Sequence, residues 1–422
     1  MVLLSKLRRN VKLLTSFATG QLASQFLQVL TGFLVIRWMT KEDFGQFTLA
    51  FAVQNTFGML VEMGLSSAFL AFIGDKHTDP VQVSRYFNAV WYWRKKLFLV
   101  IAPLSLVAFI LLTYDKNWTL LTQALLFLSI PLAIYYQGFS SFYSVVLRIK
   151  SEIGAVYKIQ VGAAIFRLVI VLALYGVSWL SGWIYLWLNA ATIVLTGLAL
   201  APLANRYRDL RTEADPESRK QVLQYIKPSM LGISFSAIQS QMTVILISIF
   251  GKTSSIADIG ALGRLGQLFT FLNAFNGMIL QPWFAKMSIG KVLKNTLFVV
   301  GTIGIGLGVF TVFSFYYPQV FQWILGKQYD NLAKEFGYSV LIACIGYISA
   351  IFLLISGTKK WVYWWSNILY IILFFLINTL GIVFLDLSTV MGIIKLSLIF
   401  SISFLLQQVA RFLYGIKFSS NI

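Results

Sequence analysis

Residues 206–220, RYRDLRTEADPESRK, form a highly charged stretch at the middle of the chain. Nine of these fifteen residues carry a charge, whereas the whole chain of 422 residues is 12% charged and 58% hydrophobic. Soluble domains average about 25% charged residues. The composition therefore indicates an integral membrane protein, and the charged stretch predicts a linker between two apolar halves.

Twelve apolar segments flank this linker, six on each side. A transmembrane helix needs about 20 mostly apolar residues to cross the hydrocarbon core. We therefore expect an all-α polytopic membrane protein of twelve transmembrane helices, in two six-helix halves at 1–204 and 228–422, joined by a cytoplasmic linker at 205–227. Polar or turn-rich breaks place the segments at 13–36, 47–73, 93–113, 119–146, 153–176, 183–203, 229–250, 259–285, 295–316, 335–356, 362–385 and 388–413.

Lysine and arginine are distributed unevenly between alternate breaks. With the N-terminus inside, the inner breaks and both termini carry 24 of the 34 Lys and Arg residues, and the outer breaks carry five. Cytoplasmic loops are enriched in these residues, so the bias predicts that both termini lie in the cytoplasm. The apolar stretch after the basic N-terminus is too long for the apolar core of a signal peptide and is interpreted as a retained first helix.

Two matching polar stripes indicate an internal repeat. At an offset of 215 residues, Gln21, Ser24, Gln25 and Gln28 fall on Ser236, Gln239, Ser240 and Thr243. Hydrogen bonds between helices, at about 0.6 kcal/mol each, explain single polar residues. Matched stripes on one helix face in both halves instead favour a central polar cavity and a two-fold axis along the membrane normal. The second and eighth segments are expected to add Asn55, Gly58, Glu62 and Ser66, and Gln267, Thr270, Asn273 and Gln281.

Five basic residues lie inside the apolar segments: Arg37, Lys158, Arg167, Arg264 and Lys395. A charge in hydrocarbon costs about 2.5–3.5 kcal/mol, so such residues line a wet interior or have partners. Arg37 is interpreted as a boundary anchor, and Lys158 and Lys395 are close enough to helix ends to snorkel. Arg167 lies near mid-membrane, on the face of Gln160, and is the strongest candidate for binding an anion. Glu62 is the candidate proton or cation site, or the partner of one of these arginines.

The sequence offers no nucleotide or metal motif. Gly251–Thr253 (GKT) resembles the end of a P-loop, but Leu246 stands where the first glycine is required. The single cysteine, Cys344, excludes an intramolecular disulfide and a cysteine-cluster metal site. We therefore expect no bound cofactor.

Several motifs occur in a characteristic order along the chain. Arg37–Gly45 (RWMTKEDFG) is similar to the pattern R-x-L-G-x-x-x-[FY]-G, with Met-Thr in place of Leu-Gly. It is followed by Gly64–Ala68 (GLSSA), by Asp258–Leu262 (DIGAL) with Pro282, and by Pro318–Tyr329 (PQVFQWILGKQY). Together they resemble bacterial polysaccharide flippases of the O-antigen type (Wzx-like), in the multidrug/oligosaccharidyl-lipid/polysaccharide exporter superfamily.

This resemblance implies a cargo and a location. The cargo would be an oligosaccharide on an undecaprenyl pyrophosphate carrier, moved from the cytoplasmic to the periplasmic leaflet of the bacterial inner membrane by alternating access. Partners would be this lipid-linked oligosaccharide, membrane lipids and other polysaccharide-assembly membrane proteins, with no nucleic acid. Guanidinium groups suit phosphate, and amides and hydroxyls suit sugar. The expected binding residues are Arg167, Lys158, Arg264, Gln21, Gln25, Gln28, Asn55, Gln160, Gln239, Thr243, Gln267 and Asn273, with Glu62 for coupling to H⁺ or Na⁺.

Two other functions remain open. A membrane polysaccharide polymerase or glycosyltransferase would usually need a sizeable outer loop with catalytic groups, and none is predicted. A cation-coupled drug exporter of the same superfamily often carries cationic cargo, which fits poorly with basic residues inside the membrane.

Overall fold

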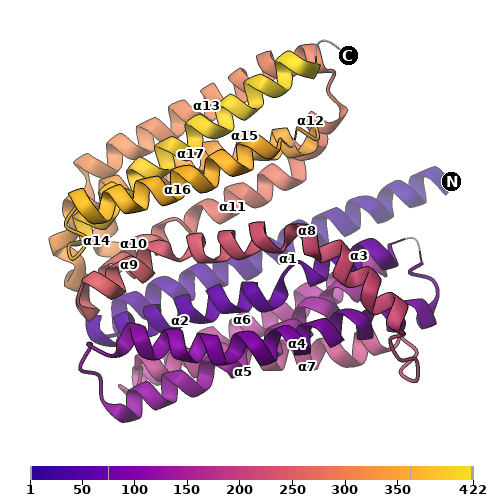
Figure 1. The fold of residues 1–422 in the computed structure, drawn as a ribbon, viewed down its shortest axis with the longest axis horizontal. Coiled ribbons are helices and arrows are strands. Elements are labelled where there is room, and N and C mark those ends of the chain that lie inside the picture. The colour runs from indigo at the N-terminus through magenta and orange to yellow at the C-terminus, as the bar shows by residue number, and fades with distance from the viewer. Residues whose placement is uncertain (1, 75, 362, 420–422) are drawn as a thin grey trace. The chain divides into compact units, whose positions relative to one another are not determined.

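The computed structural model describes residues 2–74, 76–361 and 363–419, with side chains described outside 2–18, 270, 271, 274, 275, 278 and 419. In this part of the chain every regular element is a helix (Figure 1). The helices pack into two compact units. One comprises Met1–Thr31 and Trp38–Ile249, and the other comprises Gly32–Arg37 and Phe250–Ile422.

The first unit is a bundle of long helices with two marked interruptions. The second helix breaks between α2 and α3, and a further break separates α8 from α9. Its elements are α1 (Val2–Trp38), α2 (Lys41–Glu62), α3 (Leu65–Ile73), α4 (Pro80–Thr113), α5 (Leu120–Ile149), α6 (Ile153–Gly176), α7 (Gly182–Asn205), α8 (Pro216–Ser240) and α9 (Met242–Phe250).

The second unit packs around α15, which contacts most of the other helices of the unit. Its elements are α10 (Thr253–Leu265), α11 (Leu268–Phe275), a π-helix (Asn276–Leu280), α12 (Gln281–Lys286), α13 (Ile289–Tyr316), α14 (Pro318–Leu325), a 3₁₀-helix (Lys327–Leu332), α15 (Ala333–Thr358), α16 (Trp364–Phe384) and α17 (Val390–Ser419). Here α1 contributes Arg37, whose Nη1 donates to the carbonyl of Trp323 at 2.7 Å and so anchors α14.

The predicted segments fall mainly within helices of the described chain. Ten helices of the described chain are long and apolar enough to cross a membrane, and α8 with α9, bent by 53°, gives an eleventh span when the pair is counted as one. The remaining segment, 259–285, is broken into α10, α11, the π-helix and α12. Pro282 lies at the start of α12, where its missing N–H is tolerated. The prediction of an all-α polytopic membrane protein is confirmed.

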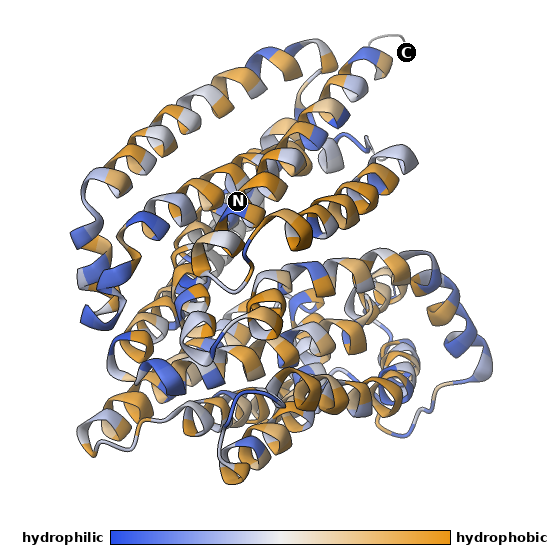
Figure 2. Cartoon of the chain, turned by 60° about the vertical axis from the view of Figure 1, so that its left-hand side comes forward, coloured by the Kyte–Doolittle hydropathy of each residue, from blue (hydrophilic) through white to orange (hydrophobic). Residues whose placement is uncertain are grey.

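Apolar side chains cover the flanks of these helices. Figure 2 shows hydrophobic residues along the helices and hydrophilic residues gathered mainly at helix ends and connections. On α4, Leu99 is 67% exposed and Leu111 is 71% exposed. Contiguous apolar surface of this kind is unfavourable in water, so it is the surface that faces lipid.

Polar side chains at the helix starts explain where the helices begin. The hydroxyl of Thr40 accepts from the N–H of Asp43 at the start of α2, and the carboxylate of Asp79 accepts from the N–H of Val81 at the start of α4. Such caps satisfy backbone donors that lack a partner within the helix. With Asp79 as its cap, α4 begins at Pro80, well before the predicted residue 93, so this end of the helix is longer than expected.

The charged stretch at the middle of the chain is partly helical. Asp215 caps α8, which begins at Pro216. The connection between α7 and α8 is therefore limited to residues 206–215. This connection packs on α4: the side chain of Asn88 donates to the carbonyl of Thr212 at 2.6 Å. The contacts therefore group α8 with the first unit. The division into 1–204, 205–227 and 228–422 stays a prediction about the repeat.

Candidate functional site

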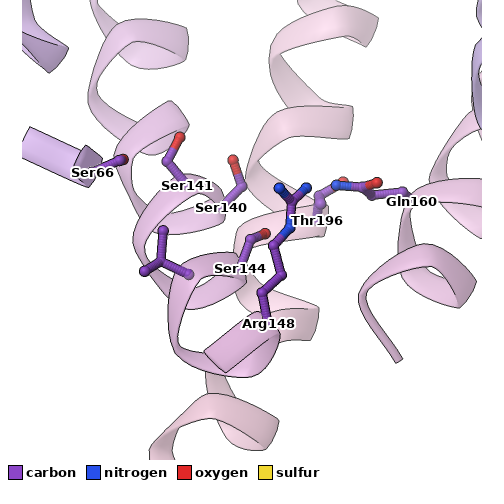
Figure 3. Close-up of a pocket in the computed structure, with 8 residues that line it drawn as sticks. Ser66, Ser140, Ser141, Ser144, Arg148, Gln160 and Thr196 are labelled. Atoms are coloured by element: carbon purple, nitrogen blue, oxygen red, sulfur yellow. The ribbon is translucent and has the colours of Figure 1, made fainter. Parts of the chain in front are cut away.

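A polar pocket of about 320 Å³ lies within the first unit, among α3, α5, α6 and α7 (Figure 3). Among the described lining residues Arg148 is the one that carries a charge, and the others except Val145 are neutral and polar. This set of groups can hydrogen-bond a polar ligand. The pocket is lined by Ser66, Ser140, Ser141, Ser144, Val145, Arg148, Gln160 and Thr196.

One face of α5 supplies most of this lining. Gln137, Ser140, Ser141, Ser144 and Arg148 follow one another at helical spacing and therefore lie on one face. The hydroxyl of Ser140 donates to the carbonyl of Gln137 at 3.0 Å, which leaves the Ser140 lone pairs free to accept. Serines are small, so this face leaves room for the pocket.

The opposite wall depends on a close approach of α7 to α5. A Cβ on Gly197 would lie 3.0 Å from the Cβ of Phe139, tighter than ordinary van der Waals contact. Beside Gly197, the hydroxyl of Thr196 donates to the carbonyl of Thr192 at 2.7 Å. Thr196 therefore presents an acceptor to the pocket.

The guanidinium of Arg148 is the electrostatic centre of the pocket. Figure 3 shows it pointing past Ser144 toward Ser140 and Thr196, with the Gln160 amide reaching in from the other side. The side chain of Arg148 is exposed. No acid of the described chain forms an ion pair with it.

An ion pair lies next to the pocket wall. Nη1 of Arg94 on α4 lies 3.1 Å from Oε2 of Glu62, and the Arg94 side chain is 3% exposed. Nη2 of Arg94 donates to the carbonyl of Ile134 at 2.6 Å, and its guanidinium lies 5.8 Å from the ring of Phe142. A Cβ on Gly138 would collide with this guanidinium, so a glycine is needed there.

Glu62 also holds the break between α2 and α3. The break places Met63 at φ 43° and Gly64 at φ 78°, both left-handed conformations. Oε1 of Glu62 accepts from the N–H of Ser66 at 2.8 Å and so caps the start of α3. The hydroxyl of Ser66 is buried without a hydrogen-bond partner in the described chain and lines the pocket.

The predicted residues of α6 lie in different surroundings. Gln160 lines the pocket, whereas Lys158 is exposed. Nη1 of Arg167 donates to Oδ1 of Asn189 on α7 at 3.1 Å, and Asn189 is buried. Nε of Arg167 is buried without a partner in the described chain.

The predicted stripes are distributed over several helices of the first unit. On α1, Gln21 accepts from the hydroxyl of Tyr157 at 3.3 Å, and Gln28 donates to the hydroxyl of Ser24 at 3.2 Å. Four further predicted binding residues of this unit are half-buried: Gln25, Asn55, Gln239 and Thr243.

The second unit holds the remaining predicted residues. Nη1 of Arg264 lies 3.4 Å from Oε1 of Gln267, and Asn273 is exposed. The side chain of Thr270 lies outside the described residues. A role for any of these residues in binding, and the central cavity itself, stay predictions.

The two arginines closest to the pocket are not among the residues predicted from the sequence. Both Arg94 and Arg148 lie beside predicted segment ends, where the sequence predicts loop residues. For Arg94 this was wrong, since α4 begins at Pro80 and buries it. For Arg148 the sequence held a sign, because Gln137, Ser140, Ser141 and Ser144 repeat the spacing of the stripe on α1 and Arg148 follows four residues later. Glu62 pairs with an arginine, but that arginine is Arg94 and not one of the five basic residues named from the sequence.

Solved structures of known proteins share this fold. No family model matches the sequence, and no curated protein matches it. The lipid II flippase MurJ, in an inward closed conformation, is similar at a TM-score of 0.69 and 13% identity, over 94% of this chain and 89% of that chain. An inward-facing multidrug resistance MATE family transporter of the MOP superfamily gives 0.66 and 15%, over 93% of each chain. The eukaryotic MATE transporter AtDTX14 gives 0.58 and 15%, over 96% and 99%. The chain has the fold of these solved MATE transporters and of the flippase MurJ.

Proposed function

We propose that this protein flips an oligosaccharide linked to undecaprenyl pyrophosphate from the cytoplasmic to the periplasmic leaflet of a bacterial inner membrane. The observation that carries the proposal is the pocket lined by hydroxyls and Arg148 within a membrane-spanning unit. The fold is shared with a flippase for a lipid-linked substrate, which supports a cargo of that kind. Alternating access, by rocking of two halves, is the mechanism natural to such repeats.

The charges of the site favour an anionic or neutral polar cargo. The pocket carries a guanidinium, and the nearby carboxylate of Glu62 is already paired with Arg94. A cationic cargo would meet uncompensated positive charge, which is strongly unfavourable where water is scarce. Sugar hydroxyls and phosphate oxygens, in contrast, match the donors that serine, glutamine and arginine provide.

Energy input is proposed to come from an ion gradient or from removal of the product, because the sequence has no nucleotide motif. Glu62 is the proposed site for H⁺ or Na⁺, and an ion that binds there must compete with Arg94. Replacing Glu62 by Gln should then remove any dependence of transport on a proton gradient. An unchanged response to the gradient in Glu62→Gln would exclude this coupling site.

A drug exporter is the second candidate, because MATE transporters share the fold over nearly the whole chain. Reconstitution separates the candidates. Purified protein in liposomes is given a labelled lipid-linked oligosaccharide, and its head group is assayed for access to an enzyme outside the vesicle. Gain of access without a new glycosidic bond supports a flippase. Efflux of a cationic dye with no movement of the lipid would support an exporter, and a new glycosidic bond would support an enzyme.

A further inference from the structure

We infer that the pocket around Arg148 binds one acidic sugar of the cargo, with the guanidinium on its carboxylate and the serine face on its ring hydroxyls. This inference rests on the proposed function and adds the chemical class of the oligosaccharide. A repeat unit that contains a uronic acid would then be preferred over its neutral counterpart.

The charge of the pocket sets the charge of the ligand. Arg148 contributes one positive charge, and no other described lining residue is charged. In the neighbouring ion pair, both carboxylate oxygens of Glu62 already accept hydrogen bonds, one from Arg94 and one from the N–H of Ser66. One unpaired guanidinium matches one carboxylate, which it binds through two parallel hydrogen bonds. A pyrophosphate carries more negative charge than this pocket compensates.

The size of the pocket limits how much of the cargo enters. Its volume of about 320 Å³ is at the lower end of the range of about 300–1,000 Å³ that small-molecule sites occupy. The pocket therefore takes a sugar unit and not a whole repeat unit with its lipid carrier.

The neutral groups suit a pyranose ring. Ser140 and Thr196 use their own hydrogens on backbone carbonyls, so they accept from sugar hydroxyls. The hydroxyl of Ser66 is buried without a partner in the described chain and gains one from the ligand. Gln160 offers both a donor and an acceptor.

The pocket also lies at the side where loading is expected. Arg148 is in the last turn of α5, at the end predicted to face the cytoplasm. Thr196 lies about two to three turns before the end of α7. A sugar entering from the cytoplasm would reach the guanidinium first.

The test compares two synthetic lipid-linked disaccharides that differ only in a terminal glucuronate or glucose. Initial flipping rates are measured in liposomes for wild type, Arg148→Gln and Lys150→Gln. Lys150 is the matched control, since it lies two residues on but over the ring of Tyr207, at 5.2 Å, and outside the pocket. We expect wild type and Lys150→Gln to prefer the glucuronate by about tenfold or more, the scale of one charge-assisted contact. Arg148→Gln should lose this preference, because its rate should fall more on the glucuronate lipid than on the neutral lipid.

The outcomes separate the acidic-sugar assignment from the flippase function. Equal rates on the two lipids in wild type, or an equal loss on both in Arg148→Gln, would overturn the acidic-sugar assignment while leaving the flippase intact. Movement of neither lipid by wild type would remove the proposed function itself. If Arg148→Gln does not assemble, Arg148→Lys keeps the charge without the paired hydrogen bonds, and we expect it to retain a reduced preference for the glucuronate.

Discussion

The carboxylate of Glu62 lies 3.1 Å from the guanidinium of Arg94, and this pair joins α2 to α4 beside the polar pocket. The same carboxylate caps α3 through the N–H of Ser66. One side chain therefore fixes the break in the second helix, the position of a buried arginine and the placement of a pocket residue.

Removal of the negative charge should destabilise the first unit. Glu62→Gln leaves Arg94 buried without a counter-charge, and breaking a buried pair in this way costs about 3–5 kcal/mol. Thermal unfolding in detergent should show a clear loss for Glu62→Gln and almost none for Glu213→Gln, which alters an exposed acid. Equal unfolding temperatures for the Glu62 variant and wild type would show that the pair contributes no net stability.

A methyl group at Gly138 should displace Arg94. Gly138→Ala places a Cβ where the guanidinium lies, so either the ion pair breaks or the helices separate. Gly162→Ala is the matched control on α6, because nothing lies within 4 Å of its added Cβ. There the substitution should stabilise by about 0.4–1 kcal/mol. Stability measured for both variants by thermal unfolding should therefore change in opposite directions, and a neutral Gly138→Ala would contradict the packing.

Arg167 should matter for transport more than for assembly. We expect Arg167→Ala to abolish flipping while the protein remains in the membrane. A charged side chain near mid-membrane is energetically unfavourable, so a basic residue found there usually has a functional role. Asn189→Ala removes the partner of Arg167 but keeps the charge, and should reduce flipping less. Wild-type transport by Arg167→Ala, measured in the liposome assay, would remove this residue from the site.

The start of α8 should depend on Asp215 and on acid. Hydrogen bonds from Ser218, together with the charge of Arg85, hold the pKa of Asp215 below its ordinary value of 3.8. Because the folded pKa is the lower one, the stabilisation is complete above pH 3.8 and is lost as the pH falls through the folded value. Asp215→Ala should cost about 0.5–2 kcal/mol at neutral pH, the usual cost of a lost helix cap.

The measurement is the free energy of unfolding as a function of pH. Glu213→Ala serves as the control, since Glu213 is exposed and does not cap α8. If Asp215→Ala shows the same acid dependence as wild type between neutral pH and the lowest pH at which the protein is soluble, the cap is not the origin of the effect.

Segment boundaries were predictable where a single physical requirement sets them. The predicted segments 119–146, 153–176 and 183–203 match α5, α6 and α7 to within a few residues, because the thickness of the bilayer and the polar caps fix both ends. The broken segment at 259–285 was not predicted as broken. Its interruption consists of a π-helix between short helices, and the apolar length of the segment gives no sign of it.

The candidate site was less predictable, because it depends on neighbours that are distant in sequence. Gln160 and Ser66 were expected to face a polar cavity, but their pocket partners on α5 and α7 were not. Arg94 illustrates the reason: its sequence neighbours Lys95 and Lys96 suggest a solvated inner loop, and only the contacts with Glu62 and Gly138 show that it is buried.

The sequence by itself determined the membrane class, the helical segments and the predicted orientation, since these follow from apolar length and from the distribution of basic residues. Tertiary structure alone decided which charges are paired, where α2 breaks and which hydroxyls surround Arg148. The physical reason is that hydrophobic length acts along one helix, whereas the state of a charge depends on groups that three or four helices bring within hydrogen-bonding distance.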